Sequence, residues 1–107
     1  MYVQVVNFNL KDITEQDYRA MCDHVAPVFG AMPGLIAKYW LADPETNTYG
    51  GVYIWESREA LDEYLNGEVF AGVKANRHLM NVTSREYGIL DAPTQVTHGF
   101  PEAALAR

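Results

Sequence analysis

Residues 35–56 read LIAKYWLADPETNTYGGVYIWE, and this stretch decides the fold. Residues 35–42 and 49–56 are rich in β-branched and aromatic residues, which is typical of β-strands. Between them, residues 43–48 combine Asp, Pro, Asn and Thr, which are the residue types of an exposed turn. The sequence therefore predicts an antiparallel hairpin in the middle of the chain.

A strand and a helix precede this hairpin. Residues 2–10, YVQVVNFNL, predict a first strand. Thr14 has the position of a helix N-cap, and apolar residues recur at spacings of three and four from Tyr18 to Met32, which predicts a helix that packs on a core. Pro27 lies within it and removes a backbone donor, so we expect a kink or a restart there.

A second helix and a last strand follow the hairpin. Ser57 caps a predicted helix over residues 58–66, Gly67 ends it, and a short amphipathic piece leads to a strand over residues 80–90. Strand, helix, hairpin, helix and strand make the split βαβ pattern. We therefore predict an α+β, ferredoxin-like βαββαβ fold with one four-stranded antiparallel sheet.

Length and charge restrict the classes of function. The 107 residues have room for one core, so we expect a single domain over residues 1–92 and a C-terminal tail over 93–107. The net charge of −6, with no basic cluster, argues against nucleic acid as a partner. No apolar run is long enough for a membrane span. A lone cysteine, Cys22, on the apolar helix stripe and an N-terminus without signal-peptide features predict a core thiol and a cytoplasmic protein.

The two helices of this pattern cover one face of the sheet, so the other face needs a cover. Along the hairpin, Lys38, Trp40, Tyr53 and Trp55 share one face by alternation, and we predict that this face is the bare one. A second copy of the chain would cover it, which predicts a homodimer, a dimeric α+β barrel, with a pocket lined by these aromatic residues. The alternative for the two tryptophans is plain packing.

Conventional sites are missing from the sequence. His24, His78 and His98 lie far apart, and neither HExxH nor CxxC occurs, so no metal site is expected. Gly50 and Gly51 lie within a strand pattern, which predicts a bulge or the close approach of a ligand or backbone and not a phosphate loop.

Several short motifs resemble one family of enzymes. Residues 55–61, WESREAL, resemble the W-E-S-x-E-A-L signature of the antibiotic-biosynthesis monooxygenase superfamily of dimeric α+β barrels. Within it, residues 33–40 (PGLIAKYW), 50–53 (GGVY) and 91–93 (DAP) most resemble YdhR-type mono-oxygenases. The resemblance implies an oxidoreductase that needs neither metal nor flavin, with molecular oxygen as co-substrate.

The resemblance also implies site residues. Members that oxygenate a substrate use an Asn on the first strand and a Trp that ends the third, and Asn7 and Trp55 match these positions. Asn7 would hydrogen-bond a substrate oxygen, and Trp55 would donate its indole N–H and form an aromatic wall. The alternative for Asn7 is a surface or edge-strand amide. Lys74 replaces the haem-ligating His of the haem-degrading branch, which argues against haem oxygenase activity.

The acid or base is less well defined. The quinol-oxidising branch uses a Tyr where this chain has Leu61, and Tyr64 lies one turn further on. We predict Tyr53 as a catalytic candidate and Lys38 as a base whose pKa is lowered by desolvation, or else a snorkelling surface lysine. Substrate contacts are predicted for Lys38, Trp40, Tyr64 and His78.

The leading functional hypothesis is a cofactor-independent monooxygenase that acts on a small aromatic substrate of the quinol or polycyclic, polyketide-like type. One alternative is a cyclase or isomerase of a reactive carbonyl compound, which would consume no oxygen. The other is a barrel that binds a small ligand without catalysis.

Overall fold

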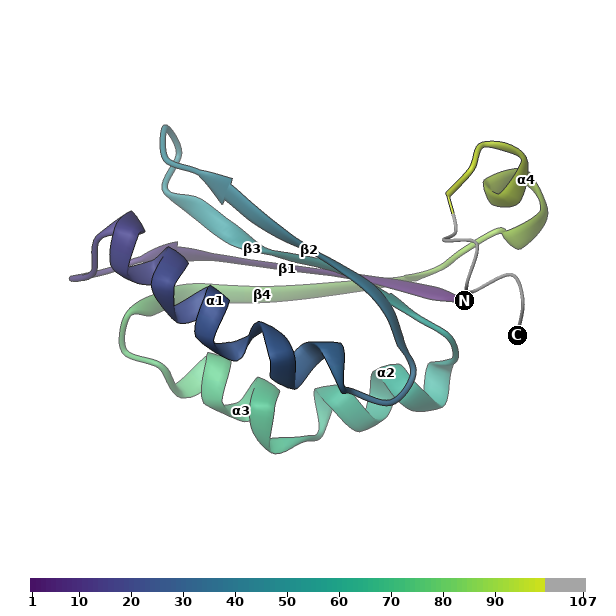
Figure 1. Cartoon of the computed structure of the whole chain (residues 1–107), viewed down its shortest axis with the longest axis horizontal. Helices are drawn as coiled ribbons and strands as arrows, with labels where there is room; N and C mark the ends of the chain where they lie inside the picture. The colour runs from purple at the N-terminus through teal and green to yellow at the C-terminus, as the bar shows by residue number, and fades with distance from the viewer. Residues whose placement is uncertain (100–107) are drawn as a thin grey trace.

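The computed structural model describes residues 1–99, and Figure 1 shows the arrangement of their strands and helices. The elements are, in chain order, β1 (Tyr2–Leu10), α1 (Glu15–Gly30), β2 (Leu35–Asp43), β3 (Thr48–Trp55), α2 (Arg58–Leu65), α3 (Glu68–Ala75), β4 (Leu79–Gly88) and α4 (Asp91–Val96). The predicted order is confirmed, and the amphipathic piece after the second helix forms α3. The expected tail starts inside α4, and its residues 100–107 lie outside the described part.

The four strands form one antiparallel sheet in the order β2-β3-β1-β4. Gln4 of β1 lies opposite Tyr53 of β3 in this register, and Val6 lies opposite Gly51. Figure 1 shows α1, α2 and α3 on one side of the sheet and α4 beyond its end, near the N-terminus. The predicted ferredoxin-like α+β fold is therefore confirmed. None of the helices within residues 1–99 is long and apolar enough to span a membrane.

Side chains at the helix ends explain where α1 and α2 begin. Thr14 Oγ1 accepts a hydrogen bond from the backbone N–H of Asp17 at 3.1 Å, and Ser57 Oγ accepts one from the N–H of Ala60 at 3.1 Å. These caps satisfy backbone donors that have no partner within the first turn. α1 continues through Pro27 to Gly30 without a break, so the alternative of a restart at the proline is wrong.

The core lies between the sheet and its three helices, and it contains the aromatic residues of the hairpin. Tyr53 is 3% exposed, and Trp55 is completely buried. The Tyr53 ring lies 6.0 Å from that of Phe29 on α1 and 5.3 Å from that of Tyr64 on α2, measured between centroids. Lys38 and Trp40 of β2 also contact Phe29 of α1. The prediction that Lys38, Trp40, Tyr53 and Trp55 lie on the bare face is therefore wrong, because all four lie on the face covered by the helices.

The reason for this error is that β3 is apolar on both sides. Alternation shows that Tyr53 and Trp55 share one face and that Val52 and Ile54 share the other, but it does not show which face the helices cover. The bare face, meaning the sheet face opposite α1, α2 and α3, carries Val52 and Ile54. It also carries Val5 and Val3 of β1, which pair with them in register.

Candidate active site

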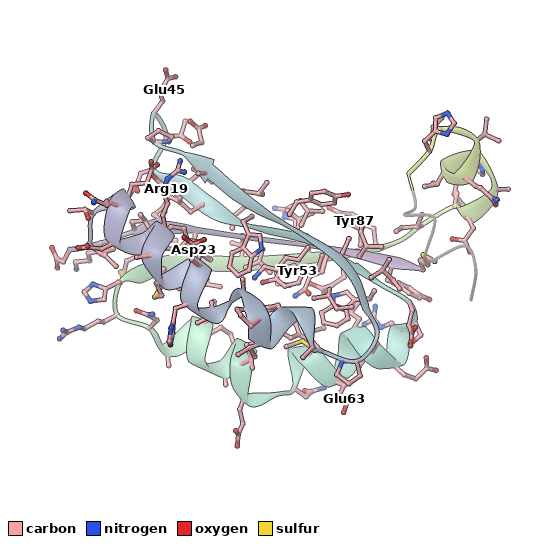
Figure 2. All side chains as sticks on the ribbon, viewed as in Figure 1. Arg19, Asp23, Glu45, Tyr53, Glu63 and Tyr87 are labelled. Atoms are coloured by element: carbon pink, nitrogen blue, oxygen red, sulfur yellow. The ribbon has the colours of Figure 1, made fainter. Side chains whose placement is uncertain are left out.

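An aromatic cluster fills the space between the sheet and the helices. Figure 2 labels Tyr53 between the sheet and α1. The Tyr53 and Trp55 rings are stacked 6.1 Å apart, and Tyr64 lies 5.2 Å from Trp55. Trp40 meets Phe29 edge-on at 5.5 Å. Strands β2 and β3 therefore present their rings to α1 and α2 as one continuous wall, which suits the binding of another ring.

Two phenols of this cluster form a hydrogen-bonded pair. The hydroxyl oxygens of Tyr53 and Tyr64 lie 3.2 Å apart, and either one can donate. Burial raises the pKa of Tyr53 above its usual value, with Tyr64 adding to the shift, and burial also raises the pKa of Tyr64. Both groups are therefore protonated at neutral pH. Two hydroxyls carry two protons and the mutual bond uses one, so the other can be donated to a ligand oxygen.

Lys38 extends from β2 into the same cluster. Its Nζ lies 3.4 Å from the ring centroids of Phe29 and Trp40 and 4.6 Å from that of Tyr53. Burial lowers the pKa of Lys38 to about 7, while nearby Cys22 acts in the opposite direction. The prediction of a lysine with a desolvated amine is confirmed, and the snorkelling alternative is wrong. Near neutral pH the amine is present in both its neutral and its charged form.

The neighbouring strand makes room for this lysine. Gly51 of β3 pairs with Trp40, which lies two residues after Lys38 on β2 and on the same face. A Cβ at Gly51 would lie 3.0 Å from Lys38 Cε and 3.2 Å from a Tyr53 ring carbon, which is closer than most side chains tolerate. The predicted close approach of backbone at the glycine pair is confirmed at Gly50, where a Cβ would overlap the Val6 carbonyl oxygen, and at Gly51 the lysine side chain approaches as well.

Lys38, Tyr53, Trp40 and Cys22 all line a cavity of about 70 Å³ between the sheet and α1. A wider groove of about 310 Å³ runs between α1 and α3. The cavity and the groove share five lining residues, Met21, Val25, Phe29, Val73 and Leu79. Lys38 and Tyr53 thus line an inner cavity that shares an apolar wall with this groove.

A polar chain that the sequence did not reveal begins at Gln4 on the helix-covered face of the sheet. Gln4 is completely buried, and its Oε1 accepts the indole N–H of Trp55 at 3.0 Å. Its Nε2 donates to Ser84 Oγ at 3.0 Å, and that hydroxyl donates to Glu86 Oε2 at 2.6 Å. The indole N–H of Trp55 is therefore used within the protein. The signal in the sequence was a polar residue in phase with apolar Val6 on β1.

Two of the predicted site residues lie elsewhere. Asn7 alternates with buried Val6 and Phe8, so it lies on the bare face, where its Nδ2 donates to the Tyr49 carbonyl at 3.4 Å. It does not meet Trp55. His78 is at the start of β4, where its Nδ1 lies 2.9 Å from the Lys11 carbonyl oxygen.

The other predicted residues, Lys38, Trp40, Tyr53, Trp55 and Tyr64, do come together. Within residues 1–99, no group of three or more His, Cys, Asp or Glu side chains is arranged to hold a metal ion. The site thus consists of one amine, two phenols and a wall of rings. Such a set can bind an aromatic ligand and move a proton.

The sequence of this chain matches a known protein family. The family described as "Putative mono-oxygenase ydhR" matches residues 3–100. The chain belongs to this family. The match covers every residue of the site, and it confirms the resemblance seen in residues 33–40 and 50–53. No curated protein matches this YdhR-family chain.

Solved structures support the fold of the YdhR-family chain. A "putative antibiotic biosynthesis monooxygenase" from Deinococcus radiodurans is 14% identical with a TM-score of 0.71, and the match covers 86% of this chain and 95% of that one. SnoaB, a cofactor-independent oxygenase from Streptomyces nogalater, is 18% identical with a TM-score of 0.63, over 85% and 95% of the two chains. The heme-degrader MhuD from Mycobacterium tuberculosis, with two hemes bound in its active site, is 19% identical with a TM-score of 0.66, over 84% and 96%.

Proposed function

We propose that this protein oxidises an electron-rich aromatic substrate, a quinol or polycyclic phenol, with molecular oxygen and without a metal or flavin. The cavity between the sheet and α1 is the proposed site. One observation carries the proposal: a member of a mono-oxygenase family holds the Lys38 amine among three aromatic rings in a cavity next to an apolar groove.

The apolar groove suits an aromatic substrate. In the proposed complex the ring lies in the groove between α1 and α3, which is lined by Val25, Phe29 and Val73 among other residues. Its oxygen points inward to Lys38 and to the Tyr53 hydroxyl. Trp55 forms part of the wall, since its N–H is donated to Gln4.

Lys38 acts as the base in this proposal. A neutral amine takes the phenolic proton, and the phenolate then reduces oxygen because its ring is electron-rich. The resulting ammonium stays beside the anion among apolar and aromatic side chains, where the attraction between the two charges is stronger than in water. A quinol and one oxygen molecule give a hydroxyquinone and one water, so the substrate supplies all four electrons. The Tyr53–Tyr64 pair donates its spare proton to the reduced oxygen.

Haem is the group that MhuD binds on this fold. The cavity of this chain does not fit it. None of the three histidines lines the cavity, and burial raises the pKa of the Cys22 thiol, which disfavours the thiolate that iron prefers. No step of the proposed reaction involves haem.

Oxygen consumption with a panel of hydroquinones and anthrone tests the proposal. Under labelled oxygen gas, we expect uptake above the spontaneous rate and one labelled oxygen atom in the product. Lys38→Met should lower the rate by about 100-fold, in line with the loss of a general base. Asn7→Ala on the bare face is the matched control and should keep the wild-type rate. Spontaneous rates alone across the whole panel would rule the proposal out.

The two alternatives have their own signatures in the same assay. Turnover of a reactive carbonyl compound under nitrogen would indicate a cyclase or isomerase. Quenching of tryptophan fluorescence by a ligand that is recovered unchanged in air would indicate a binding protein.

A further inference from the structure

Within residues 1–99, the Lys38 amine lies in apolar surroundings and forms no ion pair. The ion pairs found within residues 1–99 join the N-terminus to Asp91, Arg19 to Glu15, and Arg58 to Asp62, and none of them involves Lys38. Its nearest groups are instead the faces of Phe29, Trp40 and Tyr53. These rings hold the side chain inward but offer no carboxylate to fix its charge.

The cavity around this amine has two larger hollows next to it. The cavity around Lys38 shares Phe29 with the groove between α1 and α3. It shares Cys22 and Trp40 with a hollow of about 420 Å³ between α1 and β2. Arg19 and Asp23 of α1 lie at this second hollow, and Figure 2 labels both. With about 70 Å³ of its own, the inner cavity suits a molecule of a few heavy atoms.

We propose that Lys38 is a carbonyl-reactive amine that captures small aldehydes and ketones as an imine in this cavity. The Nζ lone pair attacks the carbonyl carbon, and the oxygen takes up a proton to give a carbinolamine. Loss of water then forms the C=N bond, with one water released for each imine. Neither an oxidant nor a reductant is needed, so this activity is independent of oxygenation.

The surroundings of Lys38 favour both steps. A lysine in water is almost fully protonated at pH 7 and cannot attack a carbonyl. Desolvation in an apolar pocket is the way in which a lysine becomes a nucleophile at neutral pH. Burial lowers the pKa of Lys38 to about 7, so about half of the molecules carry the neutral amine at this pH. The Tyr53–Tyr64 pair supplies neutral phenols on the same side of the sheet.

Reductive trapping tests the proposal. The full chain is incubated briefly at pH 7 with limiting propanal and sodium cyanoborohydride, digested, and analysed by peptide mass spectrometry. The chain has three lysines, Lys11, Lys38 and Lys74, and the first and last are exposed, so they serve as internal references. We expect propylation at Lys38 to exceed that at Lys11 and Lys74 by at least about tenfold, because far more of its amine is neutral.

Two variants complete the experiment. Lys38→Met should lose the dominant label while Lys11 and Lys74 keep their weak labelling, and Lys74→Met should leave the label at Lys38 unchanged. Equal labelling of the three lysines, or the weakest labelling at Lys38, would overturn the proposal. Trapping needs no aromatic substrate, so this result is independent of the oxygen-uptake assay, and either activity can be refuted while the other stands.

Discussion

At the scale of the residue, burial of the Lys38 amine lowers the stability of the protein by an amount that depends on pH. Its pKa is lowered from 10.5 to about 7 in the folded state, so between these pH values the unfolded chain binds more protons. The buried amine of Lys38 therefore lowers the free energy of unfolding more at pH 7 than at pH 10. Lys38→Met removes the penalty, and we expect it to stabilise the protein at pH 7 by about 1–3 kcal/mol more than at pH 10, with partial exposure taken into account.

Urea unfolding at the two pH values measures this difference, and Lys74→Met on the exposed side of α3 is the control. If Lys38→Met shifted the stability equally at both pH values, the desolvated amine would be the wrong description of this site.

Gln4 is the second residue with a specific consequence. Gln4→Met keeps the length of the side chain but removes the acceptor of the buried Trp55 N–H and the donor to Ser84. An unsatisfied buried donor costs about 1–3 kcal/mol, so we expect a loss of stability of this size in urea unfolding. In Trp55→Phe the indole N–H is already absent. Gln4→Met should cost less in that background, and strictly additive losses would contradict the coupling.

At the scale of the element, the hairpin illustrates what the sequence can and cannot predict. The turn residues and the aromatic, β-branched runs located both strands to within a residue or two, because these signals are local. Which face of β3 meets the helices is decided by packing with distant α1 and α2, and both faces of β3 are apolar. The face on which Asn7 lies could not be predicted either. Its match to a family position did not reveal that it points away from Trp55.

Gly50 shows a local constraint within the same hairpin. It has φ +143°, and a Cβ at this position would overlap the Val6 carbonyl oxygen of β1. Gly50→Ala should therefore destabilise the protein by about 2 kcal/mol or more, because the new side chain would be strained at this φ and would overlap the backbone of β1. Gly72→Ala is the matched control, because no atom lies within 4 Å of its Cβ in α3. It should stabilise the helix by about 0.5–1 kcal/mol, and thermal unfolding compares the two. Equal effects would contradict the described packing of β1 on β3.

At the scale of the whole molecule, the bare face is the feature that one chain leaves incomplete. It carries Val3, Val5, Val52 and Ile54, and Tyr39 on the same face of β2 is 57% exposed. We propose that a second copy covers it, in line with the dimeric barrel predicted from the sequence. Light scattering should give about twice the chain mass of 12.0 kDa, and Ile54→Lys should give the single-chain mass. A wild-type monomer at micromolar concentration would contradict this proposal.

The proposed association and the proposed chemistry then lie on opposite faces of the sheet, whereas the sequence predicts both on one face. The bare face is available for association, while the proposed chemistry lies within each chain, between the sheet and its helices. The residues of the site therefore all come from one copy, and a variant on the bare face tests assembly without touching Lys38.

The pH dependence of oxygen uptake tests the central claim most directly. With a hydroquinone that the wild-type protein oxidises, kcat/KM should rise with pH and level off above about pH 7, because Lys38 must lose its proton to act as the base. In Lys38→Met this rise of kcat/KM with pH should disappear together with most of the rate, and Asn7→Ala should keep both. A Lys38→Met variant with the rate and pH profile of the wild type would contradict the account.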